Sequence, residues 1–261
     1  MSEQHQTFPN GVEAALLIVV LFLLEIGVAE VLLSFDSFAN VNPMDLWALI
    51  TVAGNGVLFS ALLAYKKMSH RELFHSARHS VASTLGVLAL PVMLLVPGLV
   101  LVTSTINSIV VEAFPMSAEQ VALFDAMGSE APIALMFTCV IAPLLEEMLF
   151  RGVILRSFLL QYSRTAAIIG SSVLFGIAHL NLYQFVTALI AGLILGWLYE
   201  RTRSLWPCIL LHAANNTFAV FSYSLIEPDV GDFSTAFYFL AYVCLIVGGI
   251  ILLRILMPSR R

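Results

Sequence analysis

Charged residues are scarce in this chain of 261 residues. Only 11% of the residues are Asp, Glu, Lys or Arg, whereas 60% are hydrophobic, and the mean hydropathy is +0.95. Soluble globular proteins carry about 25% charged residues. The composition therefore excludes an ordinary water-soluble domain and is typical of a polytopic membrane protein.

Cysteine is also rare, and so are the signals of processing or repetition. Cys139, Cys208 and Cys244 all fall inside apolar runs without a CxxC pair, so no disulfide framework is expected and we interpret them as small core residues. The polar residues 1–13 lack the basic region and cleavage site of a signal peptide, so the apolar run from Leu16 is expected to stay as a first membrane span. We find no convincing internal repeat and treat residues 1–261 as one integral membrane domain.

Long hydrophobic runs dominate the rest of the chain. Because lipid-exposed backbone must satisfy its own hydrogen bonds, each run is expected to be a helix. We expect an all-α bundle of about eight membrane helices, at about residues 12–35, 45–65, 80–103, 132–160, 164–180, 183–199, 205–224 and 234–256.

The basic residues are segregated along the chain. If the helices alternate and the N-terminus lies inside, all 12 Lys and Arg residues fall on the inner side. The charged residues of the outer connections are then all acidic. This is the positive-inside pattern, and it predicts that both termini are cytoplasmic. The inner residues are Lys66, Lys67, Arg71, Arg78, Arg151, Arg156, Arg164, Arg201, Arg203, Arg254, Arg260 and Arg261.

Two connections contain further polar features. The outer residues 107–130 are moderately apolar and could form an amphipathic helix on the membrane surface. The inner residues 66–80 contain His70, His75 and His79. We interpret this segment as a solvated loop, with a metal-binding histidine cluster as the alternative.

Two adjacent carboxylates, Glu146 and Glu147, end an apolar run in the fourth predicted helix. A charge near the centre of a bilayer costs roughly 3 kcal/mol on insertion scales, so such a pair is expected to have a function. Glu147 and Arg151 share a helix face and are expected to form an ion pair. Glu146 lies about 100° around the helix, without a partner nearby in sequence, and is free to point into a cavity.

Two histidines and an asparagine lie in the later predicted helices. His179 ends the fifth helix, and His212 and Asn216 share one face of the seventh. A single membrane histidine is more often an interhelical hydrogen-bonding group than a catalyst. Together with Glu146, however, these residues form a set that can converge on one site, which we expect to open toward the cytoplasm.

Such a set could activate water. A carboxylate in an apolar cavity can accept a proton from water, while His and Asn can donate hydrogen bonds to the oxyanion that forms when water attacks a carbonyl. Zinc held by Glu146, His179 and His212 is a further possibility, but the chain has no HExxH and no metal is certain. Glu25, near the middle of the first helix, and Glu30 could face the cavity, pair elsewhere or mark a substrate path.

The ordered motifs Glu-Glu-x-x-x-Arg, Phe-x-x-x-His and His-x-x-x-Asn resemble those of the CPBP intramembrane proteases, which include the type II CAAX prenyl endopeptidases. The resemblance covers residues 131–224, the expected catalytic core. It implies that Glu146 activates water, that Glu147 and Arg151 complete its motif, and that His179, His212 and Asn216 complete the site. The family's catalysis need not use a metal.

The resemblance implies a membrane endopeptidase whose partners are membrane lipid and a peptide, prenylated or otherwise membrane-anchored protein. No nucleic acid is expected. The compact chain favours a bacterial cell membrane. Two alternatives are a non-catalytic immunity or regulatory scaffold of the same fold and a proton-coupled transporter. A complete motif set argues against the scaffold, and the absence of paired broken helices argues against the transporter.

Overall fold

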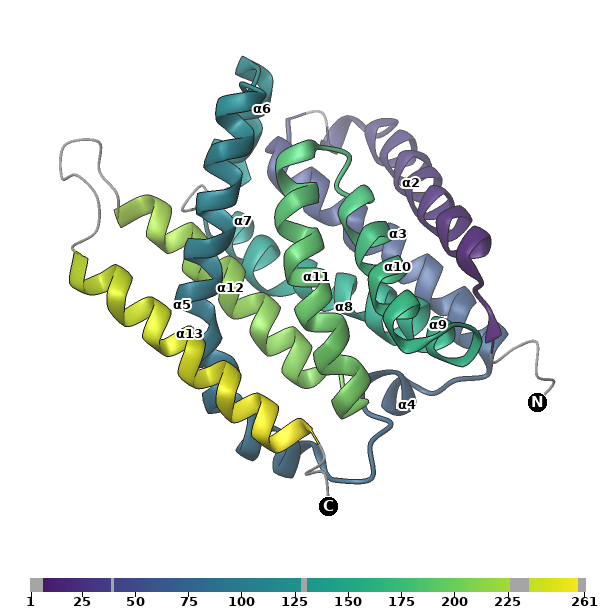
Figure 1. Cartoon of the computed structure of the whole chain (residues 1–261). Coiled ribbons are helices and arrows are strands. Elements are labelled where there is room, and N and C mark those ends of the chain that lie inside the picture. The colour runs from purple at the N-terminus through teal and green to yellow at the C-terminus, as the bar shows by residue number, and fades with distance from the viewer. Residues whose placement is uncertain (1–6, 39, 128–130, 226–234, 258–261) are drawn as a thin grey trace.

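The computed structural model describes residues 7–38, 40–127, 131–225 and 235–257. Within these ranges the chain is helical and contains no β-strand (Figure 1). The elements are α2 (Gly11–Leu33), η1 (Asp36–Phe38), α3 (Pro43–Lys66), α4 (His70–Phe74), α5 (Val81–Ala113), α6 (Ala118–Met127), α7 (Pro132–Met136), η2 (Phe137–Ile141), α8 (Ala142–Glu147), η3 (Met148–Leu155), α9 (Arg156–Gln161), α10 (Arg164–Ile177), α11 (Leu182–Thr202), α12 (Trp206–Leu225) and α13 (Thr235–Leu256).

The predicted class, a polytopic helical membrane bundle, is confirmed. Among the described residues, 6 helices are long and apolar enough to cross a membrane: α2, α3, α5, the run from Pro132 to Gln161, α11 and α13. Large apolar side chains such as Val12, Leu90 and Phe239 are about 70% exposed, as expected for contact with lipid. All eight expected segments are helical, but α10 has only 14 residues and α12 is not among the six candidate spans. A count of eight spans and their orientation therefore stay predictions.

The fourth predicted helix runs without interruption from Pro132 to Gln161, but two parts of it are π-helical. These parts are η2 and η3, and they lie on either side of the short α8 that carries both glutamates. All eight residues of η3 are buried, and η3 packs against α10 and α11, while α8 packs against α12. Such π-helical turns occur frequently at functional sites. This run is thus the central element of the bundle.

The fifth predicted helix ends earlier than expected. Helix α10 stops at Ile177, so His179 lies in the connection to α11 and not inside a helix. Leu180 adopts the left-handed conformation, with φ of 56°, which ends the helical run. The side chain of Asn181 then accepts a hydrogen bond from the Gln184 N–H and caps α11.

The bundle has two distinct ends (Figure 1). Helix α6 and the α10–α11 connection lie at one end, and α4 lies at the other. At the α4 end, Arg156 Nη1 donates to the Glu72 carbonyl at 2.6 Å, and Ser76 N donates to the Arg203 carbonyl at 3.0 Å. Of residues 107–130, predicted to be amphipathic, 107–113 continue α5 and 118–127 form the short helix α6, whose apolar and polar residues are not separated onto two faces; 128–130 lie outside the described residues. The predicted inner loop, residues 66–80, contains the short helix α4. We call these the α6 end and the α4 end.

Candidate active site

One cavity of about 630 Å³ is lined by four of the six predicted site residues, and the other two, Glu147 and Arg151, are buried behind it. Glu146, His179, His212 and Asn216 all line it. They come from α8, the α10–α11 connection and α12, but the cavity wall also includes residues of α2 and α3. The site therefore extends beyond residues 131–224, the core expected from sequence.

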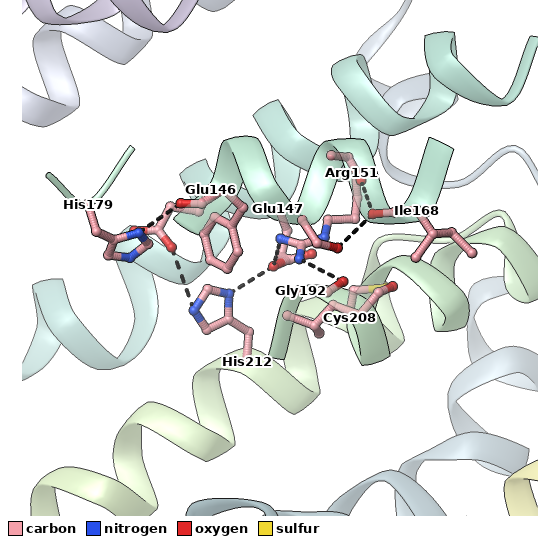
Figure 2. A network of polar contacts seen from close by, with 12 residues as sticks. Glu146, Glu147, Arg151, Ile168, His179, Gly192, Cys208 and His212 are labelled. Carbon is pink, nitrogen blue, oxygen red and sulfur yellow. Dashed lines mark hydrogen bonds and ion pairs between the residues drawn. The ribbon is translucent and has the colours of Figure 1, made fainter. Parts of the chain in front are cut away.

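The imidazole of His212 lies between the two adjacent carboxylates (Figure 2). Its Nδ1 is 2.8 Å from Glu147 Oε1, and its Nε2 is 3.6 Å from Glu146 Oε2. The side chain of Glu147 is 0% exposed, whereas that of Glu146 is 30% exposed. Consecutive residues of one helix thus meet different surroundings, as their angular separation predicts.

Glu147 also forms the expected pair with Arg151. Arg151 Nη1 donates to Glu147 Oε1 at 2.8 Å, and both side chains are buried. The guanidinium is further held by the Gly192 carbonyl at 3.3 Å and lies over the Phe175 ring, with Cζ 4.5 Å from the centroid. Glu147 Oε1 therefore accepts from two side chains, and only the contact to Arg151 was predicted. The contact to His212 joins residues 65 positions apart and has no local sequence signal.

The contact with Glu147 orients His212. Because a carboxylate only accepts hydrogen bonds, the proton on Nδ1 is assigned from geometry to the bond with Glu147. The Nε2 nitrogen then faces Glu146 across a gap slightly too long for a direct hydrogen bond. A water molecule bound beside these two groups would be held by a carboxylate and an imidazole at once.

Phe175, the first residue of the predicted Phe-x-x-x-His motif, supports several site residues. Its ring packs edge-on against both His179 and His212, with centroid distances of 5.1 and 5.7 Å. Its carbonyl is 2.9 Å from His179 Nδ1. Since Arg151 lies over the same ring, Phe175 fixes the relative positions of three polar side chains.

The two asparagines of α12 differ in their contacts. Asn216 Nδ2 donates to the Thr138 carbonyl at 3.1 Å, in the π-helical turn η2. Pro143 has no N–H to offer that preceding turn, which favours an outside donor there. Asn215 also lines the cavity, and its buried Oδ1 has no hydrogen-bond partner among the described residues. Asn215 was not among the predicted site residues.

The other polar residues considered from sequence differ in whether they reach the cavity. Glu25 lines the cavity, but the exposed Glu30 does not. His75 Nδ1 is 2.9 Å from Ser204 Oγ, so this histidine joins the α4 segment to the start of α12. Cys139 and Cys208 are free and buried, as expected of core residues, whereas Cys244 is free but only half-buried.

Zinc was expected, if present, on Glu146, His179 and His212. In the part of the chain that the structure describes, no group of three or more His, Cys, Asp or Glu side chains is placed to hold a metal ion. The hydrogen bonds at the Nδ1 atoms of both histidines leave each Nε2 available, so these bonds do not argue against a metal. As placed in this structure, the described side chains do not form the expected zinc shell, and a metal stays an untested prediction.

The cavity reaches the α6 end of the bundle. Its wall includes Met44 at the start of α3, Ala126 of α6 and Leu180 of the α10–α11 connection. Toward the α4 end, Glu147 and Arg151 are buried and close the site. This differs from the expectation that water reaches the glutamates from the Arg151 side.

Comparison with known proteins supports the resemblance of the motif-bearing segment. Residues 128–218 match the family model "Type II CAAX prenyl endopeptidase Rce1-like". The chain is also 31% identical over 99 residues to "Putative membrane peptidase YdiL" of Bacillus subtilis (strain 168); the match covers 38% of this chain and 40% of that relative. No solved structure matches.

The matched segment contains the glutamate pair, both histidines and Asn216, the residues on which the resemblance was predicted. The chain spans only about two fifths of the length of its relative, so the similarity concerns the core of the site. The predicted resemblance is thereby confirmed: residues 128–218 are similar to the Rce1-like endopeptidases of the CPBP, or CAAX protease, family.

Proposed function

We propose that the protein is an intramembrane endopeptidase in which Glu146 activates water. The match of residues 128–218 to an endopeptidase family supports this class of reaction. The observation that carries the proposal is the difference between the two carboxylates. Glu146 borders the cavity and is partly exposed, while Glu147 is fully buried between Arg151 and His212.

The proposed reaction is hydrolysis of one peptide bond. Water beside Glu146 and His212 Nε2 gives a proton to the Glu146 carboxylate while its oxygen attacks the substrate carbonyl carbon. We assign Asn216, at the cavity wall, as the donor that stabilises the oxyanion. His212 was also expected to donate, but its Nε2 carries no proton in the tautomer set by Glu147 and accepts a hydrogen bond from the attacking water instead. Asn216 uses one amide N–H on the Thr138 carbonyl and has a second one for this purpose. The C–N bond then breaks, and Glu146 returns the proton to the leaving amine.

In this proposal Glu147 and Arg151 are positioning residues, whereas His179 faces the substrate. Glu147 holds His212 in one tautomer. Arg151 balances the negative charge of the buried Glu147 carboxylate. His179 lines the cavity close to Phe175 and is free to contact the substrate through Nε2. This division of roles follows the exposure of each group.

The substrate class is proposed on the character of the cavity. Its wall is mainly apolar, with residues such as Phe22, Trp47 and Phe137 beside the polar set. An apolar cavity in a membrane bundle suits a peptide segment that is membrane-associated or lipidated. We place the protein in a bacterial cell membrane, in line with its similarity to a membrane peptidase of Bacillus subtilis.

The decisive experiment is cleavage by purified protein in detergent. Glu146→Gln keeps the shape of the side chain but removes the base, so we expect hydrolysis to fall by at least about a hundredfold while the fold stays intact. Glu30→Gln on the exposed face of α2 is the matched control and should cleave like the unaltered protein. Equal activity of Glu146→Gln and the control would contradict the proposal.

The role of a metal has its own test. Because the described side chains do not form a zinc shell, we expect hydrolysis to persist after dialysis against a chelator, with less than stoichiometric zinc in the protein. Elemental analysis measures the zinc content of the protein, and the cleavage rate before and after chelation shows whether hydrolysis depends on it. Activity that is lost on chelation and regained with added Zn²⁺ would assign the metal to the site.

A further inference from the structure

A second polar pair, Glu25 of α2 and Asn55 of α3, lines the same cavity as Glu146 and His212. Both residues lie outside residues 128–218, the segment that matches the endopeptidase family. The motifs of that family therefore assign no role to them. Their position makes them part of the wall that a bound substrate would touch.

The geometry of this pair is well defined. Asn55 is only 4% exposed, and its Nδ2 donates to the Thr51 carbonyl at 2.9 Å and faces Glu25 Oε1 at 3.4 Å. A Cβ on Gly54 would lie 2.7 Å from Glu25 Cγ, so the glycine leaves the space that the Glu25 side chain occupies. The carboxylate is thus held against α3 at the cavity wall.

The charge of the cavity is one-sided. Its lining contains two carboxylates, Glu25 and Glu146, and two histidines, but no Lys or Arg. Among the described residues no basic side chain forms an ion pair with Glu25. An ionisable group inside a membrane is costly and usually has a partner of opposite charge. For Glu25 the described chain supplies only an amide.

We propose that Glu25 and Asn55 form a subsite that binds a positively charged side chain of the substrate, with arginine as the best fit. A guanidinium would supply the missing positive charge and donate to the Glu25 carboxylate in a planar, bidentate pair. Asn55 positions that carboxylate. This inference rests on the proposed endopeptidase function and adds a preference for a basic residue near the cleaved bond, and against an acidic one.

The test uses apolar peptides in detergent that carry one arginine at successive positions. Each has matched peptides with citrulline, which has nearly the same shape without the charge, and with glutamate. At one position we expect arginine to raise kcat/KM about tenfold over citrulline, since a hydrogen bond to a charged group discriminates by about this factor or more. The peptide with glutamate at that position should have a lower kcat/KM than the peptide with citrulline. If no position favours arginine in the unaltered protein, the inference is wrong.

The variant Glu25→Gln removes the charge and keeps the size. We expect the arginine-to-citrulline ratio to fall to about one, mainly through KM, because the substrate loses its charged partner. Glu30→Gln, on the same helix but outside the cavity, should keep the full ratio. If Glu25→Gln lowers cleavage of both peptides equally and keeps the ratio, Glu25 has a structural role and the subsite does not exist.

A binding measurement separates this inference from the proposed function. Fluorescence anisotropy of a labelled arginine peptide and its citrulline match reports affinity even if neither is cleaved. Tighter binding of the arginine peptide that Glu25→Gln abolishes supports the subsite. Equal binding of the two peptides overturns it, even if Glu146-dependent cleavage is found.

Discussion

The role of a residue in this site depends on which face of the helix it occupies. Glu146 and Glu147 are chemically identical and adjacent, yet one borders a cavity and the other is enclosed between Arg151 and His212. Glu147 has a structural role, because its buried Oε1 accepts hydrogen bonds from both Arg151 and His212. Partial exposure leaves Glu146 able to exchange a proton with water.

Removal of Arg151 tests the structural value of this pair. Arg151→Ala leaves Glu147 buried with one partner fewer, and breaking a buried pair typically costs about 3–5 kcal/mol. We expect a clearly lower midpoint of thermal unfolding in detergent and a lower folded yield.

The matched control for Arg151 is Arg164→Ala. Arg164 pairs with Glu200 at 3.0 Å but its side chain is 45% exposed. Exposed pairs contribute at most about 1 kcal/mol. If both variants unfold at the same temperature, the buried pair does not stabilise the fold in the way that we infer.

Sequence alone predicted the contacts that depend on local spacing. The Glu147–Arg151 pair follows from positions four apart on one helix. The bond from Glu147 to His212 could not be predicted, because it depends on how α8 packs against α12. The role of Asn215 was missed for the same reason, since two adjacent asparagines look equivalent until their faces are known.

At the scale of elements, the site depends on helices that approach closely. Gly176 of α10 faces Phe185 of α11, and a Cβ on it would lie 2.8 Å from Phe185 Cδ2 and 3.0 Å from the Phe185 carbonyl oxygen. Gly192 of α11 faces Ser172 of α10 in the same way, with a Cβ 3.0 Å from the Ser172 Cβ. Small residues are the usual means of close helix packing in membranes.

We therefore expect Gly176→Ala to force α10 and α11 apart. Overpacking of this kind typically costs about 1–3 kcal/mol, and the shift would also displace His179 in the α10–α11 connection. Thermal unfolding and cleavage should both be impaired. Gly27→Ala on α2 is the control, since a Cβ there meets nothing within 4 Å, and it should unfold no earlier than the unaltered protein. Identical behaviour of the two variants would show that the α10–α11 contact tolerates the added carbon.

The helical elements were predicted closely because apolar runs in a membrane chain must be helical. Two features were not predicted. The π-helical turns η2 and η3 lie in a run that reads as one ordinary helix. The early end of α10 depends on the left-handed Leu180, and no glycine marks that position in the sequence.

At the scale of the whole molecule, the cavity reaches one end of the bundle, and basic residues lie at the other. The cavity wall includes Leu180 and Ala126 at the α6 end, whereas Arg71 of α4 and Arg203 lie at the α4 end. If the basic end is cytoplasmic, as the positive-inside rule predicts, the part of the cavity that reaches the α6 end lies toward the other side of the membrane. Cytoplasmic access was predicted instead, and both the orientation and the side of access stay predictions.

Labelling of single cysteines distinguishes the two cases. Leu180 is 75% exposed at the cavity rim, and His79 is exposed near the α4 end. In a chain whose three native cysteines are replaced, we expect a membrane-impermeant thiol reagent to label Leu180→Cys on intact cells. His79→Cys should react only after the membrane is opened. The reverse pattern would place the α4 end outside and the cavity in the cytoplasm.

The two glutamates lie between π-helical turns, and their orientation limits where residues can be inserted or deleted in this chain. One residue added or lost between Phe137 and Glu146 would turn the pair by about 100° relative to α12. Glu147 would then meet the cavity or lipid, and the imidazole of His212 would lose its buried anion. Deletions and insertions in the connections leave this angle unchanged, so variation in length is compatible with the site in the connections but not within residues 137–151 or the part of α12 before His212.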